Sequence, residues 1–179
     1  MNITLNSKTK ITITAIVLVF VSGLLLLEHL QGGVGSHYLF ASKDMPKMSN
    51  WWGLLIVPSM TWILLSLMQK NHKGPDGEQR PVYKQEINGF IGAFLFGITM
   101  TILYYNSPDL PGYFMLMTFA LALFLPIYRP QYFLGFMLSM TYGFGGVLPV
   151  IFGLILVPIY FIEYRFIRTA FLFIWNKIK

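Results

Sequence analysis

Residues 28–52 decide how the rest of the chain is interpreted, and they read E-H-L-Q-G-G-V-G-S-H-Y-L-F-A-S-K-D-M-P-K-M-S-N-W-W from Glu28 to Trp52. This stretch gathers histidine, carboxylate and lysine side chains between two uncharged apolar runs, residues 11–27 and 53–68. With its flanking residues, each run approaches the roughly 20 residues that an α-helix needs to cross a bilayer. The sequence therefore predicts a polar loop that joins two membrane helices.

The composition favours a membrane protein of one domain, residues 1–179. Apolar residues make up 55% of the chain and charged residues 11%, whereas soluble domains carry about 25% charged residues. The net charge of +6 comes from Lys and Arg at the ends of apolar runs, which is typical of cytoplasmic loops. The expected partner is therefore the lipid bilayer and not nucleic acid. Because the chain has no cysteine, disulfides, thiolate catalysis, iron–sulfur clusters and cysteine-type zinc sites are excluded.

We predict an all-α fold, a polytopic transmembrane helical bundle of six helical segments. The predicted helices cover residues 9–30, 51–69, 87–106, 113–128, 131–143 and 149–163. We interpret the first as a signal anchor and not a cleaved signal peptide, because no small-residue cleavage site follows it. Within this helix Ala15, Ser22 and His29 recur every seven residues, which predicts a face that packs against another helix and turns His29 toward the bundle.

The last two segments form a short or re-entrant hairpin in this prediction. As one helix, residues 130–162 would be about 50 Å long, well beyond a hydrocarbon core of about 30 Å. The glycines and proline of Gly143–Pro149 offer a break, which leaves two short legs. Basic residues before and after the hairpin favour the same side of the membrane. The alternative is a five-span chain with one tilted helix and an external tail. We expect residues 164–179 to form an amphipathic interfacial tail.

Charge also predicts the orientation and location. The basic segment 69–81 is placed in the cytoplasm, and the connection 107–112, which has no Lys or Arg, outside. Both termini are then cytoplasmic, in a cell membrane of the bacterial inner-membrane type.

Two rows of small residues predict close helix contacts. In the third helix, residues four apart lie on one face: Gly89, Ala93, Gly97, Thr101 and Tyr105. In the fifth helix, Gly135, Ser139 and Gly143 repeat the pattern. Such faces let two helix backbones approach closely, either within this chain or against a partner subunit or second copy.

The predicted topology places several polar side chains near the outer face, and these are the candidate ligand-binding residues: Glu28, His29, His37, Asp44, Tyr104, Tyr105 and Asp109. A pairing of Glu28 with His29 or His37 is the most specific hypothesis, since ionisable groups at membrane depth usually face a cavity or a partner. Carboxylate and imidazole could divide acid and base roles or bind a divalent metal. His29 and His37 are the candidate metal ligands, but their spacing of eight residues is not that of a helical metal pair. No other cofactor is expected.

Three other features have simpler interpretations. The Gly32-Gly33-Val34-Gly35 segment lacks the preceding strand and the Lys of a phosphate loop, and we interpret it as a turn. Arg129 could bind a lipid phosphate but is first a topology determinant. His72 lies in a polar segment and is expected to be solvated.

Three classes of function fit these patterns. The first is a transport-type or accessory membrane protein with an outward-facing polar pocket for a small molecule, ion or lipid. The second is an intramembrane enzyme that acts on a lipid or isoprenoid-like substrate, with Glu28 or Asp44 as acid or base and His29 or His37 as its partner. The third is a structural subunit whose small-residue faces pack against another protein.

Overall fold

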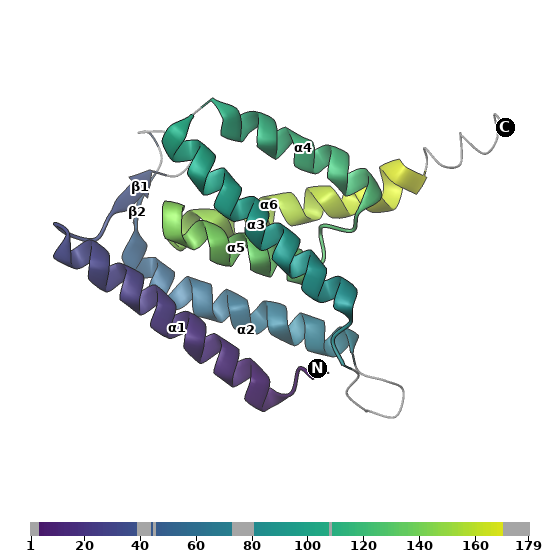
Figure 1. The fold of residues 1–179 in the computed structure, drawn as a ribbon, viewed down its shortest axis with the longest axis horizontal. Helices are drawn as coiled ribbons and strands as arrows, with labels where there is room; N and C mark the ends of the chain where they lie inside the picture. The colour runs from purple at the N-terminus through teal and green to yellow at the C-terminus, as the bar shows by residue number, and fades with distance from the viewer. Residues whose placement is uncertain (1–3, 39–43, 45, 73–80, 108, 170–179) are drawn as a thin grey trace.

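The computed structural model describes residues 4–38, 44, 46–72, 81–107 and 109–169. Within these residues the chain forms six α-helices and one short hairpin of two strands (Figure 1). The elements, in order, are α1 (Ser7–Leu30), β1 (Ser36–Tyr38), β2 (Lys47–Ser49), η2 (Asn50–Trp52), α2 (Gly53–Asn71), α3 (Lys84–Asn106), α4 (Leu110–Phe124), α5 (Pro130–Phe144), α6 (Val147–Ile162) and η3 (Glu163–Ile167). The six predicted helices are therefore confirmed, with small shifts at their ends.

Four of the helical segments are long and apolar enough to cross a membrane: Ser7–Leu30, Asn50–Asn71, Lys84–Asn106 and Val147–Ile167. Helix α4 is a shorter apolar helix. It ends at Phe124, four residues before the predicted end, because Leu125 precedes a proline and adopts an extended backbone (φ −115°, ψ 138°).

Successive helices run in alternating directions, so that α1 begins and α6 ends at the same end of the molecule (Figure 1). We call this the basic end, because the helices begin or end there near Lys8, Lys84 and Arg129. The opposite end, which carries the connections near Gly35, Ser107 and Gly145, is called the loop end.

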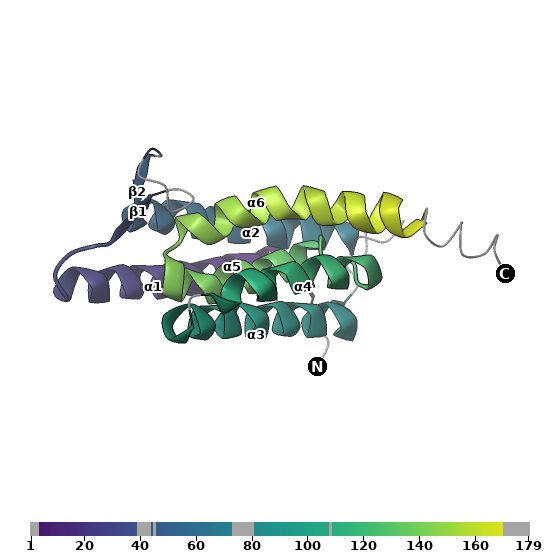
Figure 2. The same cartoon turned by 90° about the horizontal axis from the view of Figure 1, so that it is seen from above.

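Helix α5 lies at the centre of the bundle, in contact with α2, α3 and α6, and Figure 2 shows it between α3 and α6. It runs parallel to α3, because Gly89 meets Tyr132 near the basic end and Thr101 meets Gly143 near the loop end. A Cβ atom added at Gly89 would lie 2.9 Å from the Tyr132 ring. The predicted close contact of the small-residue faces is confirmed, and within this chain the two faces pack against each other.

The buried face of α1 differs from the prediction. Ala15, Ser22 and His29 are exposed, whereas the side chains that pack against α2 are Val17, Val21 and Leu25. Large branched and aliphatic side chains supply more contact area than Ala and Ser, which explains why this face of α1 packs against α2. His29 consequently points away from the bundle.

The predicted break between the last two helices is confirmed at Gly145 and Gly146. Gly145 has a φ of 72°, which is the left-handed region that favours glycine. Gly146 lies against the backbone of Gly53 at the start of α2, where an added Cβ would come within 2.6 Å of Gly53 Cα. The turn is therefore held at the loop end by direct contact with α2.

Two features were not predicted. The helix of α6 continues through one π-helical turn, η3, as far as Ile167, so this segment is long enough to cross a membrane and is not a short leg. The tail thus begins later than residue 164, and its residues 170–179 lie outside the described part. The hairpin β1–β2, in which His37 pairs with Met48, was missed because strands of three residues give no clear alternation of apolar and polar residues.

Candidate functional site

Glu28 holds the connection between α1 and α2 in place. Its carboxylate accepts a hydrogen bond from the Gly35 backbone N–H at 3.0 Å and from the Asn50 side-chain amide at 3.1 Å. Asn50 is buried, with 5% of its surface exposed, and its own backbone N–H donates to the Gly35 carbonyl at 3.0 Å. Glu28 therefore stabilises a buried polar contact that joins α1, the hairpin and α2.

The other predicted residues are spread around the loop end. Tyr105 donates from its hydroxyl to the Gly143 carbonyl at 3.0 Å, and the Tyr104 ring contacts the Phe144 ring with centroids 4.7 Å apart. His29, Asp44 and Asp109 are exposed. His37 belongs to β1, but its side chain lies outside what the structure describes.

Glu28 and Tyr105 are linked only through intermediate groups. The Asn50 side chain, which binds Glu28, packs directly against Gly145, and Tyr105 binds Gly143 two residues earlier in the chain. Among the described residues, the Glu28 carboxylate accepts hydrogen bonds from Gly35 and Asn50 and not from His29. These contacts join the ends of the helices at the loop end, and both oxygens of the Glu28 carboxylate accept hydrogen bonds within them.

We expect Glu28→Gln to lower the free energy of unfolding by about 1–2 kcal/mol, because a neutral amide replaces a charged acceptor and places an N–H toward the donors of Asn50 and Gly35. Denaturation with sodium dodecyl sulfate in mixed micelles, followed by circular dichroism, would measure the change. His29→Ala is the matched control, because His29 is the next residue in the chain and is exposed. This substitution should leave the free energy of unfolding unchanged. Equal stability of the two variants would show that the Glu28 contacts do not stabilise the fold.

No group of three or more His, Asp or Glu side chains able to hold a metal ion is found among the described residues. The two candidate metal ligands, His29 and His37, are only in part described, and the metal hypothesis stays a prediction.

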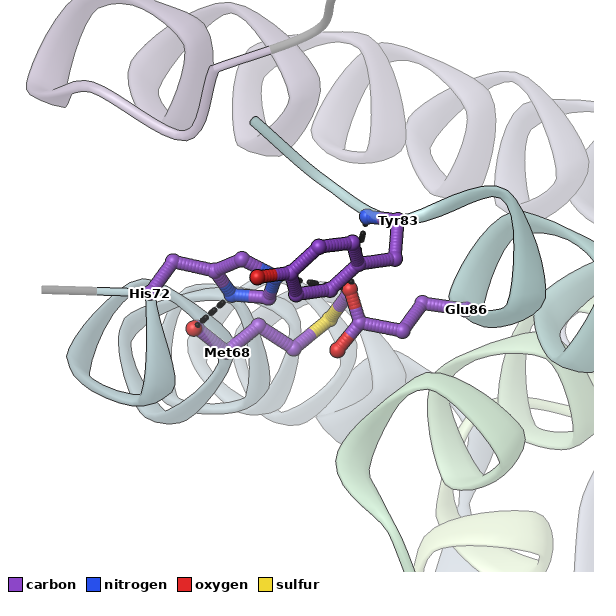
Figure 3. A network of polar contacts seen from close by, with 4 residues as sticks. All are labelled: Met68, His72, Tyr83 and Glu86. Atoms are coloured by element: carbon purple, nitrogen blue, oxygen red, sulfur yellow. Dashed lines mark hydrogen bonds and ion pairs between the residues drawn. The ribbon is translucent and has the colours of Figure 1, made fainter. Parts of the chain in front are cut away.

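His72 is buried within a group of polar contacts that the sequence did not indicate (Figure 3). The prediction that it is solvated is wrong, since only 2% of its surface is exposed. Its Nδ1 lies 2.7 Å from the Met68 carbonyl, and its Nε2 lies 2.7 Å from Glu86 Oε2. The Tyr83 ring covers the imidazole with centroids 5.5 Å apart. Helices α2 and α3 are thereby joined at the basic end.

The contact with Met68 fixes one proton of the His72 imidazole. A carbonyl only accepts, so His72 Nδ1 carries a hydrogen that it donates to Met68. His72 Nε2 lies at ion-pair distance from Glu86 Oε2, but outside the geometry of a hydrogen bond. Glu86 Oε2 also accepts the Tyr83 backbone N–H at 3.1 Å, which caps the first turn of α3. The pair stabilises a helix terminus and a helix contact together.

A cavity of about 310 Å³ lies between α3, α4, α5 and α6, in the lower part of the size range of ligand pockets. It is partly open, and its wall is almost entirely apolar. The larger side chains that line it include Phe96, Met115, Leu121, Phe133, Phe136 and Leu156. Three small residues, Gly92, Ala93 and Gly153, also line the cavity, and a Cβ added at Gly92 would meet no atom within 4 Å.

Three hydroxyl groups interrupt this apolar wall. Thr118 donates to the Met115 carbonyl at 2.5 Å and lies 2.5 Å from the Tyr160 hydroxyl. Since the single proton of Thr118 is used, Tyr160 donates to Thr118. Tyr132 also lines the cavity, and its hydroxyl makes no hydrogen bond to another residue of the described part. The cavity therefore suits a long apolar molecule with few polar atoms.

A second cavity of about 330 Å³ lies between α1, α3 and α5. Three hydroxyl residues line it, Thr101, Ser139 and Tyr142, and the hydroxyls of Thr101 and Ser139 donate to carbonyls of their own helices at 3.0 and 2.9 Å. Neither cavity is lined by Glu28, His29, Asp44, Tyr104, Tyr105 or Asp109. The sequence missed the first cavity because Thr118 and Tyr160 are isolated hydroxyls in apolar runs, which give no motif.

Comparison with known proteins adds no relative. No family model matches the chain, and neither the curated proteins nor the solved structures contain a match to it.

Proposed function

We propose that this chain is a polytopic membrane protein that binds the apolar chain of a lipid in the cavity between α3, α4, α5 and α6. The observation that carries the proposal is the cavity itself. Its volume is about 310 Å³, and the side chains that line it in the described part of the chain are apolar except for the hydroxyls of Thr118, Tyr132 and Tyr160. A charged or strongly polar ligand would lose its hydration there without replacement, whereas a hydrocarbon chain would not.

The distribution of charge supports a membrane orientation with both termini in the cytoplasm. Of the described basic residues, one lies at the loop end, Lys47, and the others lie at or near helix ends of the basic end: Lys8, Lys10, Lys70, Lys84, Arg129, Arg165 and Arg168. Such an excess of Lys and Arg is typical of the cytoplasmic side. The cavity is then closer to the cytoplasmic face, since Leu125 and Ile127 line it.

The length of the contact between α3 and α5 supports six crossings. Helix α5 contacts α3 from Gly89 to Tyr105, a distance of about 24 Å along the helix axis. This is most of a hydrocarbon core of about 30 Å. Because α5 is covered by α2, α3 and α6, it does not need the length of a helix that faces lipid.

A lipid-binding role fits the accessory or transport-type class of function. The enzyme alternative would need an acid and a base that face a common space, and the described contacts of Glu28 are to Gly35 and Asn50. We therefore place binding of the ligand, and not its chemical conversion, at the centre of the proposal.

We expect Gly92→Leu to reduce labelling of the protein by a photoreactive, diazirine-bearing fatty acid by at least about fivefold. Gly92 lines the cavity, and a Cβ added there meets no atom within 4 Å, so leucine would occupy the cavity without straining the fold. Each buried methylene of the displaced chain contributes about 0.8 kcal/mol, which makes partial filling a measurable loss. The readout is the labelled fraction, with the labelled peptides located by mass spectrometry.

The matched control is Gly23→Leu, because Gly23 also has no atom within 4 Å of an added Cβ but lies on α1, away from the cavity. It should label like the unmodified protein. If Gly92→Leu labels as strongly as Gly23→Leu, or if the labelled peptides lie outside α3 to α6, the cavity is not the lipid site.

A further inference from the structure

Aromatic contacts bring the chain segments that carry Arg129 and Arg168 together at one corner of the basic end, near the cavity. The Tyr128 ring contacts the Phe161 ring with centroids 5.2 Å apart and the Tyr164 ring at 5.7 Å. Arg129 follows Tyr128, and the Arg168 guanidinium lies 4.8 Å from the centre of the Tyr164 ring. We call Tyr128, Arg129, Tyr164 and Arg168 the arginine corner.

The arginine corner adjoins the cavity along both chain segments that form it. Ile127 and Tyr132 line the cavity and lie just before and after Arg129. Tyr160 also lines the cavity, and Tyr164 and Arg168 follow it at intervals of four residues, which places them on the same side of the helical segment. A molecule whose apolar end occupies the cavity can therefore reach the arginines with its polar end.

The charge of this corner favours an anion. Arg129 and Arg168 give the arginine corner a charge of +2, and the neighbouring Arg165 and Glu163 offset each other. Among the residues that the structure describes, no carboxylate lies within ion-pair distance of these arginines. Arg129 is exposed and Arg168 is partly exposed. Stacking on Tyr164 orients the Arg168 guanidinium and leaves its N–H edge able to bind a phosphate in bidentate fashion.

We infer that the ligand of the cavity is an anionic phospholipid, with an acyl chain between α3, α4, α5 and α6 and with its phosphate held by Arg129 and Arg168. This inference rests on the proposed function and adds the class of ligand to it. A zwitterionic lipid presents the same tail and phosphate but carries a compensating cation, so the net charge of the corner favours the anionic headgroup.

The test is native mass spectrometry of the full chain in detergent with phosphatidylglycerol or phosphatidylcholine of identical acyl chains. We expect the unmodified protein to bind phosphatidylglycerol more tightly, by on the order of tenfold. The double variant R129Q/R168Q should weaken the binding of both lipids, and that of phosphatidylglycerol more, so that the preference falls to about twofold or less. An unchanged far-UV circular dichroism spectrum shows that the variant is folded. A preference that stays at tenfold in the double variant would overturn the assignment.

Lys47→Gln provides the matched control, because the Lys47 ammonium also lies near an aromatic ring, 5.9 Å from the centre of Tyr38, but at the loop end. Lys47→Gln should keep the full preference for phosphatidylglycerol. Loss of this preference in Lys47→Gln would mean that the net charge of the protein alone decides lipid binding. Inorganic phosphate in tenfold excess over the lipid should not displace it, and displacement would overturn the lipid as the source of the phosphate.

Gly92→Leu separates this inference from the proposed function. One outcome would overturn the headgroup site alone: Gly92→Leu binds both lipids more weakly, and R129Q/R168Q keeps the full preference for phosphatidylglycerol. Unchanged binding of both lipids in Gly92→Leu would overturn the cavity site and with it the proposed function.

Discussion

Gly135→Val should lower the free energy of unfolding by about 3 kcal/mol, near the upper end of the cost of overpacking a core. A Cβ added at Gly135 would overlap the Phe90 carbonyl oxygen and lie 3.0 Å from the Phe94 backbone nitrogen. Both atoms belong to the backbone of α3, so neither can move without displacing the helix. The valine would separate α3 from α5, the central helix of the bundle.

Denaturation with sodium dodecyl sulfate, followed by far-UV circular dichroism, measures this loss. Gly23→Val is the control, since valine replaces glycine in a helix there too but no atom lies within 4 Å of the added Cβ. The difference between the two variants removes the change in helix propensity from the comparison. A difference below about 1 kcal/mol, the lower end of the cost of overpacking, would contradict the close packing of α3 on α5.

His72→Ala should cost about 3 kcal/mol, because it breaks a buried pair and leaves Glu86 without its partner. The loss lies at the low end for such pairs, since the Glu86 side chain is 14% exposed and still accepts the Tyr83 N–H. The Met68 carbonyl at the end of α2 also loses the His72 Nδ1–H. The same denaturation assay measures the effect.

The partner variant and a double-mutant cycle test whether the loss comes from this pair. Glu86→Gln should cost less than His72→Ala, because it keeps the size of the side chain and removes only its charge, and the two losses should not add in the double variant. Additive losses would show that His72 stabilises the fold through packing alone and that the contact with Glu86 is incidental.

The helices could be predicted from the sequence because local signals mark their ends. Arg129-Pro130 begins α5, and Gly145 ends it with a positive φ that glycine adopts readily. The contact of α3 with α5 was predictable as well, since Gly89 and Gly97 form a row on one face that only a close neighbour can fill. Helix ends and small-residue faces each depend on residues within a single helix, so the spacing of residues along the sequence is enough to predict them.

Features that depend on two distant elements could not be predicted. Ala15 and Ser22 follow a regular spacing in α1, but in a membrane most of the helix surface is apolar, and the face that packs is chosen by the complementary shape of α2. His72 is buried because α3 begins at Lys84 and places Glu86 beside it. The polar residues between His72 and Glu86 in the sequence predict only a loop, and they give no sign of this contact. The cavity is likewise formed by four helices at once.

The central position of α5 has a consequence for biosynthesis. The helix has only 15 residues and includes Gln131, Ser139 and Thr141 among its buried side chains, so a translocon that tests each segment for partition into lipid would receive a weak signal from it. A nascent chain that stops at Phe144 would lack the apolar companion α6 and the turn that rests on Gly53. We therefore expect α5 to enter the bilayer as a pair with α6, after the glycine face of α3 is already in place to receive it.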